Sequence, residues 1–185
     1  MVNSIIFWQN TIFVTKIDQS LIDVAESSFS ESYKNKLQKE SLHYTNSLSA
    51  RYIISKYLLE KNGNRNEIPI WIYSVSKWKN LEKKIFFSYS FTHSILWYIY
   101  IAWIVASSKV GIDAEFIKER NISLFQKYRV SNRESFYKLR TAKEAIVKYN
   151  NLSANELENI DIGKYDFMTK KLLIDNQEMI ISIMI

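Results

Sequence analysis

A chain of 185 residues, of which 47% are hydrophobic and 15% aromatic, can bury a substantial core in one domain or in two small, tightly joined halves. Its 3 glycines and 1 proline exclude a collagen-like or linker-rich chain, and the lack of cysteine excludes disulfides and thiolate metal sites. The formal net charge of +6 indicates either a basic soluble protein or one with anionic partners, such as nucleic acid, a phosphorylated cofactor or an acidic protein.

The first residues, MVNSIIFWQNTIF, lack the basic region and the small-residue cleavage site of a signal peptide. The longest apolar run, at 95–106, is well short of the ~20 residues that a membrane-spanning helix needs. It is rich in Tyr, Trp and Ile, which favours a buried strand. Together with the lack of cysteine, these features predict a cytoplasmic protein without a membrane partner.

The first part of the chain mixes strand and helix patterns. Strands are expected at 5–17 (one or two, around a polar turn at 9–10), 68–75, 86–91 and 97–105. Three helices are expected here. The first lies at 20–26, and the second is a lysine-rich helix that begins at a capping box formed by Ser28 and Glu31. The third lies around 50–58, where Arg51 and Ser55 lie off the apolar stripe. A polar stretch at 61–64 ends the last of these helices, and 77–84 is expected to be a loop.

The second part repeats this mixture. A short strand is expected at 110–115, and a second capping box, Ser131 to Glu134, begins a helix that runs to about Tyr149. The tail, 165–185, is expected to form two or three strands. Strands and helices that alternate without a linker between them predict an α+β fold.

The expected strand at 110–115 ends in the sequence GIDAE at 111–115. Because side chains alternate between the faces of a strand, Asp113 and Glu115 lie on one side and Ile112 and Ala114 on the other. Two neighbouring carboxylates repel each other unless a divalent cation lies between them. A solvated strand end explains an isolated pair of this kind equally well.

Glu144 and Lys148 are four residues apart on the expected helix and therefore share a face. Taken alone, this spacing favours a surface ion pair. With Asp113 and Glu115 it supplies three carboxylates and an ammonium group, a set suited to Mg²⁺-assisted attack at phosphorus. His93, just after an expected strand, is one of only two histidines; a lone histidine is more often structural, but beside a phosphate it could donate a hydrogen bond.

Three motifs in this order and spacing, FTHS at 91–94, GIDAE at 111–115 and TAKEAIVK at 141–148, resemble those of the surfactin-type 4′-phosphopantetheinyl transferases. The segment RYIIS at 51–55 is similar to the helix that carries an arginine in that family. Lys77 keeps the lysine of the family's Gly-Lys-Pro loop. The motifs cover residues 28–150, and the rest of the chain is similar in pattern only.

The resemblance implies two similar α/β halves related by a pseudo-twofold axis, with coenzyme A in the cleft between them. The halves are expected at 1–106 and 107–185, packed as a single functional unit, with the metal site in the second half. The implied activity is Mg²⁺-dependent transfer of 4′-phosphopantetheine from coenzyme A to a serine of an acidic apo acyl or peptidyl carrier protein, with release of 3′,5′-ADP. This chemistry belongs to holo-carrier synthesis in secondary metabolism, and the resemblance implies a monomer.

The resemblance also implies roles for single residues. Asp113, Glu115 and Glu144 would hold Mg²⁺ against the pyrophosphate of coenzyme A. Glu144 would help to deprotonate the serine, and Lys148 would steady the pyrophosphate or protonate the leaving group. Residues expected to contact coenzyme A are Arg51, Lys77 and His93 at its phosphates, Thr92 at adenine and, as weaker candidates for the terminal phosphate, Lys34, Lys36 and Lys39.

The chain also departs from the family pattern. Arg140 replaces a family Trp or Phe, which either removes packing behind the helix or puts a new cation beside the site. The Gly and Pro of the nucleotide loop are missing, and the second half is short. Two alternatives therefore stay open: a family member that binds coenzyme A or a carrier without transfer, and a Mg²⁺-dependent nuclease. The nuclease lacks the carboxylate-x-lysine expected on one strand, because Lys118 comes three residues after Glu115.

Overall fold

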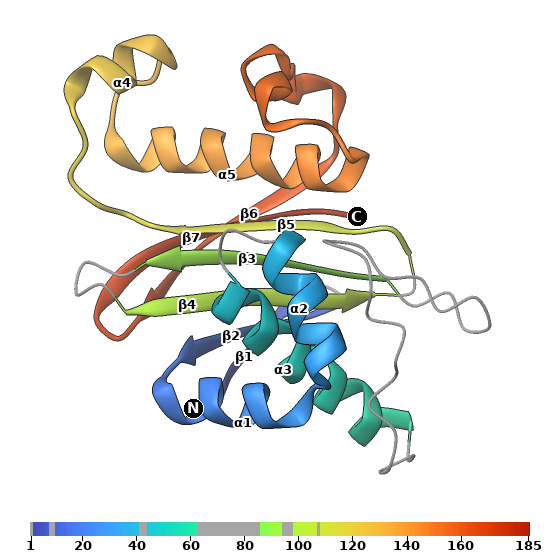
Figure 1. Cartoon of the computed structure of the whole chain (residues 1–185). Coiled ribbons are helices and arrows are strands. Elements are labelled where there is room, and N and C mark those ends of the chain that lie inside the picture. The colour runs from blue at the N-terminus through green and yellow to red at the C-terminus, as the bar shows by residue number, and fades with distance from the viewer. Residues whose placement is uncertain (1, 8–9, 41–43, 63–85, 94–97, 107) are drawn as a thin grey trace.

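The computed structural model describes residues 2–7, 10–40, 44–62, 86–93, 98–106 and 108–185 (Figure 1). The elements in chain order are β1 (Val2–Phe7), β2 (Asn10–Ile17), α1 (Gln19–Ser28), α2 (Glu31–Glu40), α3 (Tyr44–Asn62), β3 (Phe86–His93), β4 (Ile99–Ala106), β5 (Gly111–Phe116), α4 (Ile122–Lys127), α5 (Arg133–Asn150), η1 (Ala154–Asn159), η2 (Ile162–Lys164), β6 (Phe167–Ile174) and β7 (Gln177–Met184). Among these, no helix combines the length and the apolar character that crossing a bilayer requires. The expected α+β class is confirmed.

The strands form two antiparallel sheets, one of order β1-β2-β4-β3 and one of order β5-β7-β6. Apart from β1, which extends the first sheet, the described elements of the two sheets follow the same connectivity. In the first, β2 is followed by helices and then by β3 and β4, and β4 pairs between β2 and β3. In the second, β5 is followed by helices and then by β6 and β7, and β7 pairs between β5 and β6. The chain crosses from the first sheet to the second between β4 and β5.

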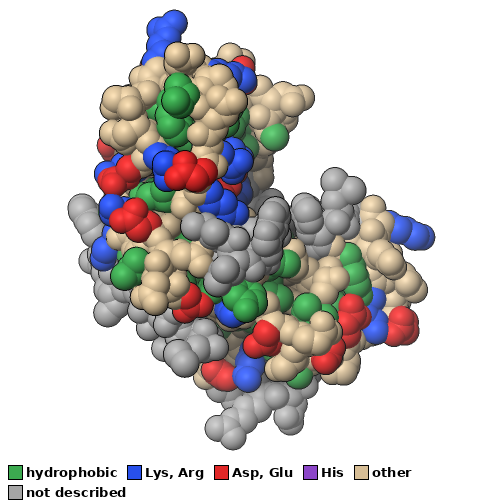
Figure 2. All heavy atoms as spheres, turned by 90° about the vertical axis from the view of Figure 1, so that its left-hand side faces the viewer, with side chains coloured by type: hydrophobic (Ala, Val, Ile, Leu, Met, Phe, Trp, Pro, Cys, Tyr) green, Lys and Arg blue, Asp and Glu red, His purple; other side chains and the backbone are tan. Residues whose placement is uncertain are grey.

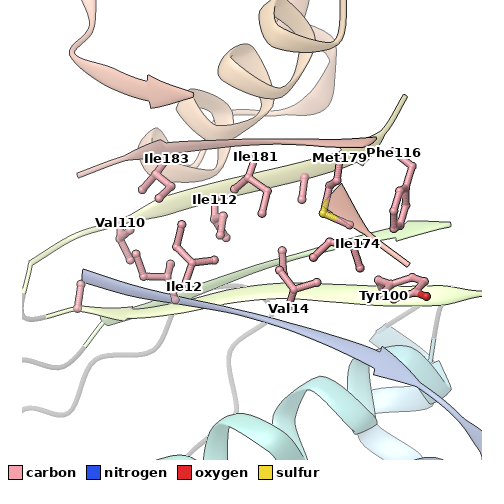
Figure 3. Close-up of a cluster of buried hydrophobic side chains, with 14 residues drawn as sticks. Ile12, Val14, Tyr100, Val110, Ile112, Phe116, Ile174, Met179, Ile181 and Ile183 are labelled. Carbon is pink, nitrogen blue, oxygen red and sulfur yellow. The ribbon is translucent and has the colours of Figure 1, made fainter. Parts of the chain in front are cut away.

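The two sheets pack face to face around the largest apolar cluster, which draws side chains from β2, β4, β5, β6 and β7 (Figure 3). Ile12 of β2, Ile112 of β5 and Ile181 of β7 are fully buried there. Each such side chain contributes about 1.5–3 kcal/mol through the hydrophobic effect. Helices α1 and α3 cover the outer face of the first sheet, with α2 packed on them, and α5 covers the outer face of the second, so the layers run helix, sheet, sheet, helix (Figure 1).

The alternation along β5 fixes which side of the second sheet carries the acidic residues. Ile112, Ala114 and Phe116 belong to the cluster between the sheets. Asp113 is in register with Ser182 of β7, whose hydroxyl lies 2.7 Å from that of Thr141 on α5. Asp113 and Glu115 therefore lie on the α5 side, which confirms the alternation predicted from the sequence.

Other sequence predictions need correction. Ser30 rather than Ser28 caps α2, since its hydroxyl accepts from the backbone N–H of Tyr33, whereas Ser28 is the last residue of α1. Asn132 rather than Ser131 caps α5, where its side chain accepts from the N–H of Ser135. The tail forms two strands. The strand expected at 68–75 and the loop at 77–84 lie outside the described residues.

Helix α3 also differs from the expected one-sided helix. Arg51 and Ser55 were expected off the apolar stripe, but they are only 2% and 0% exposed. Ala50 and Ile54 pack toward β4, while Leu48 packs against α1 and α2. Because α3 lies between the sheet and two other helices, its polar positions are enclosed as well as its apolar ones.

Candidate metal centre

Gly111 brings the first strand of the second sheet directly against α5. A Cβ atom at this position would lie 2.2 Å from the carbonyl oxygen of Ala145 and 2.7 Å from the backbone nitrogen of Tyr149. No side chain fits in that space, so only glycine permits this approach of the two backbones. The consequence is that the acidic positions two and four residues later lie against the last turns of α5, which carry Glu144 and Lys148.

Three carboxylates converge where β5 meets α5. One oxygen from each of Asp113, Glu115 and Glu144 lies within 4.8 Å of the others. Their side chains are 2%, 18% and 26% exposed, in that order. They line a pocket of about 220 Å³ whose other described walls are Asn46, Ser90, Phe91 and Lys148. The pocket is therefore lined by residues of β3 in the first sheet, of β5 in the second, and of the helices α3 and α5.

The two oxygens of Asp113 have different surroundings. Oδ1 accepts hydrogen bonds of 2.7 Å from the Ser90 hydroxyl and 2.7 Å from the Lys148 ammonium group. Oδ2 is buried and, within the described part of the chain, has no hydrogen-bond partner. A buried carboxylate oxygen without a partner costs free energy unless a ligand completes its surroundings. That oxygen is therefore open to a cation or another ligand that enters the pocket.

The guanidinium group of Arg140 contacts both glutamates. Its Nε donates to Glu144 Oε1 at 2.9 Å, and its Nη2 lies 3.9 Å from Glu115 Oε1. The other oxygen of Glu115 accepts from the Thr92 hydroxyl at 3.2 Å. Of the two effects expected at Arg140, the structure therefore shows the new cation beside the site. The ion pair favoured by spacing alone is replaced: Lys148 bonds Asp113 while Glu144 bonds Arg140.

This crowding changes the acidity of both glutamates. Burial raises the pKa of Glu115, and the charge of Asp113 raises it further, against Arg140 and the Thr92 hydrogen bond. Burial also raises the pKa of Glu144 to about 7, with Asp113 acting in the same direction and Lys148 and Arg140 opposing it. A carboxyl group that titrates near neutrality can accept or release a proton during a reaction at physiological pH.

A row of hydroxyls on β3 supports the carboxylates. Ser88, Ser90 and Thr92 occupy alternate positions and are all buried. Ser88 Oγ accepts from the N–H of Ile112, and Thr92 Oγ1 accepts from the N–H of Phe116, both at 3.2 Å. Strand β5 is an edge strand, so these hydroxyls satisfy backbone donors that no neighbouring strand pairs in its sheet.

Ser88 and Ser90 were missed in the sequence. Their only signal is that FFSYSFT at 86–92 places small hydroxyl residues at every second position of an expected strand.

Other residues expected to contact coenzyme A either do not line the carboxylate pocket or lie outside the described part of the chain. Arg51 is enclosed beneath α2, where it donates to the Tyr33 hydroxyl at 3.0 Å, and it does not line the carboxylate pocket. Lys34 forms ion pairs with Glu26 and Glu31. The other two lysines of this group, Lys36 and Lys39, are exposed on α2.

Three further residues, Thr92, His93 and Lys77, were predicted to contact coenzyme A. The Thr92 hydroxyl is bonded to Glu115 and to the backbone of β5, and its expected adenine contact stays a prediction. The side chain of His93, at the end of β3, and the whole of Lys77 lie outside the described part of the chain. Their expected phosphate contacts stay predictions.

Comparison with known proteins adds no assignment. No model of a known protein family matches the chain, and no curated protein matches it significantly. What the site does is therefore inferred from its residues and geometry.

Proposed function

We propose that the chain is a Mg²⁺-dependent transferase that moves 4′-phosphopantetheine from coenzyme A to a serine of an apo acyl or peptidyl carrier protein. The observation that carries this proposal is the convergence of Asp113, Glu115 and Glu144 beside Lys148. These residues belong to two of the three linked motifs on which the resemblance to 4′-phosphopantetheinyl transferases rests. Their meeting in one pocket is what that resemblance requires.

The side chains present fit Mg²⁺. All three candidate ligands offer carboxylate oxygens, which this hard cation prefers, and the buried Oδ2 of Asp113 has no hydrogen-bond partner among the described residues. Asp113, Glu115 and Glu144 would hold the ion. When bound, it would neutralise oxygens of the coenzyme A pyrophosphate and so lower the barrier to attack at phosphorus.

The chain's own residues would handle the proton and the leaving group. The serine oxygen attacks the β-phosphorus of coenzyme A, and the bond from that phosphorus to the oxygen of the departing 3′,5′-ADP breaks. Glu144 would accept the proton of the serine hydroxyl, directly or through a water molecule. Lys148 donates a hydrogen bond to the departing phosphate and offsets its developing charge.

The fold supports the same proposal. Apart from β1, the described elements of both sheets have the connectivity strand, helices, strand, strand, with the last strand in the middle. This common pattern is what two halves related by a pseudo-twofold axis would display. Ser90 from the first sheet and Asp113 from the second meet in the pocket, so the site lies at the junction expected to hold coenzyme A.

Mass spectrometry of a panel of apo carrier proteins tests the transfer. After incubation with the protein, coenzyme A and Mg²⁺, at least one carrier should gain the mass of one phosphopantetheine group. Asp113→Ala and Glu144→Gln should abolish this gain while circular dichroism shows a folded chain. Modification by either variant at the wild-type rate, or full activity of the wild type in excess chelator, would refute the site assignment.

One rival function has an observation in its favour. Arg140 bonds Glu144 and lies near Glu115, so its guanidinium group already neutralises part of the carboxylate site. Such a site is compatible with a protein that binds coenzyme A or a carrier without transferring phosphopantetheine. In the same mass spectrometry experiment it would yield a carrier complex without covalent modification.

The nuclease alternative has less support. On the face drawn in Figure 2, Lys and Arg side chains are interspersed with Asp and Glu rather than gathered in an unbroken basic stripe. Incubation of plasmid DNA with the protein and Mg²⁺ distinguishes this alternative, since a nuclease would cut the plasmid.

A further inference from the structure

Arg140 is placed to contact more than the two glutamates it holds. It lies one helical turn before Glu144 on α5, and its side chain is 33% exposed, more than any of the three carboxylates. Its hydrogen bond to Glu144 uses only Nε, at 2.9 Å, and the contact of Nη2 with Glu115 is longer, at 3.9 Å. A guanidinium group has five N–H donors, so within the described part of the chain most of them are left for a further partner.

The charges of the site make this arrangement sensitive to a metal ion. Within the described residues, Lys148 pairs with Asp113, and Arg140 is the cation in closest contact with Glu144 and Glu115. A divalent cation that binds these two glutamates withdraws the negative charge that holds Arg140 and repels the guanidinium group. The glutamates therefore cannot hold both cations as tightly as they hold either one alone.

We propose that Arg140 exchanges partners: it bonds the two glutamates while the metal is absent, and binds a phosphate group of the substrate once a divalent cation occupies them. Arginine matches phosphate with two parallel hydrogen bonds, and the exposed fraction of Arg140 lets it reach a ligand in the pocket. The inference rests on the metal site of the proposed function, but it holds for any diphosphate substrate and does not depend on the carrier.

The exchange predicts opposite effects of one substitution. Without its guanidinium group, Arg140→Gln has no internal cation to compete with the metal, so its affinity for Mg²⁺ should rise about threefold or more. The same variant has lost a charge-assisted contact to phosphate, so its affinity for diphosphate should fall on the order of tenfold. A residue that only stabilises α5 would not move the two affinities in opposite directions.

Isothermal titration calorimetry measures both affinities on the full chain. Mg²⁺ is titrated first, and inorganic diphosphate is then titrated with Mg²⁺ in fixed excess. Lys138→Gln is the matched control, because Lys138 lies on the same helix, carries the same charge and pairs with Glu134 outside the pocket. It should leave both affinities within twofold of the wild type, a limit that separates a local contact from the general loss of one charge.

Arg140→Lys supplies a second variant that keeps the charge. It should retain wild-type Mg²⁺ affinity more closely than Arg140→Gln and still lose diphosphate affinity, because an ammonium group cannot form the paired hydrogen bonds. If the wild type binds no Mg²⁺, both the proposed function and this inference fail. If it binds Mg²⁺ but Arg140→Gln does not bind it more tightly, or keeps wild-type diphosphate affinity, only the exchange is overturned.

Discussion

Two hydrogen bonds fix the orientation of the Asp113 carboxylate and leave its Oδ2 without a partner among the described residues. Its Oδ1 is held by Ser90 and Lys148, so the carboxylate cannot rotate without breaking two hydrogen bonds. The sequence predicted that Asp113 and Glu115 share a side of a strand, because alternation is a local property. It could not predict that Lys148 pairs with Asp113 rather than Glu144, since that choice depends on how closely β5 approaches α5.

Glu144 gives the free protein a pH-dependent stability. Its pKa is about 7 in the folded chain, raised first by burial and then by Asp113, against an ordinary value of 4.5. Between these values the native state binds more protons than the unfolded state, so stability falls as pH rises from about 4.5 to about 7. The decrease should be on the order of 2 kcal/mol in urea unfolding without metal.

Two controls make this prediction specific. Glu144→Gln cannot titrate, so the decrease over this pH range should become smaller. Glu119→Gln removes an exposed carboxylate that pairs with Arg133 and should keep the wild-type slope. Equal slopes for the wild type and Glu144→Gln would show that Glu144 does not titrate in this range in the folded chain.

At the scale of elements, β3 joins the second sheet through side chains instead of through a backbone ladder. Its hydroxyls at alternate positions bond either a carboxylate or a backbone N–H of β5. Strand and helix patterns predicted most of the elements within a few residues. They could not predict this junction, because a contact between the edges of two sheets leaves no periodic signal in either strand.

Ser90 and Ser88 should therefore have separable effects. Ser90→Ala removes one of the two hydrogen bonds that orient Asp113 and should lower Mg²⁺ affinity about tenfold, as is usual when a residue that orients a metal ligand is removed. Ser88→Ala leaves the N–H of Ile112 unsatisfied and should lower stability by about 1–3 kcal/mol with little change in Mg²⁺ affinity. Calorimetry and urea unfolding of both variants check this, and similar Mg²⁺ affinities for the two would contradict it.

Gly111 sets the distance between β5 and α5. Gly111→Ala would place a Cβ atom 2.2 Å from the Ala145 carbonyl oxygen, so one backbone has to move. We expect a loss of about 1–3 kcal/mol in urea unfolding, together with weaker Mg²⁺ binding because the ligands on the two elements separate. Gly163→Ala is the control, since its Cβ would meet only the Asp161 side chain, at 3.4 Å. Equal stability of the two variants would show that the close approach is not needed.

At the scale of the whole molecule, the mixture of strand and helix patterns predicted the α+β class but not the order of the strands. Sheet order depends on which edges meet, and sequences of this length allow several orders that bury the same apolar faces. The motif spacing predicted that the acidic strand and the later helix contribute residues to one site. The enclosure of Arg51 was not predictable, because it follows from α3 having neighbours on several sides.

The net charge of +6 bears on how an acidic carrier would be recognised. Raising the ionic strength from about 0.01 M to about 1 M shortens the Debye length from about 30 Å to about 3 Å. The kcat/KM for an acidic carrier should then fall by about tenfold or more, because long-range attraction is screened. A short neutral peptide with the same serine, as acceptor, should lose much less. Equal losses would mean that charge does not guide the carrier.

Diffraction from crystals soaked in Mn²⁺, recorded near the manganese absorption edge, locates a bound divalent cation without reference to activity. We predict one anomalous peak in direct contact with carboxylate oxygens of Asp113, Glu115 and Glu144, with the Oδ2 of Asp113 as one of the ligands. Saturating Mn²⁺ that produces no peak there, with the glutamates still held by Arg140, would contradict the metal site and the function proposed from it.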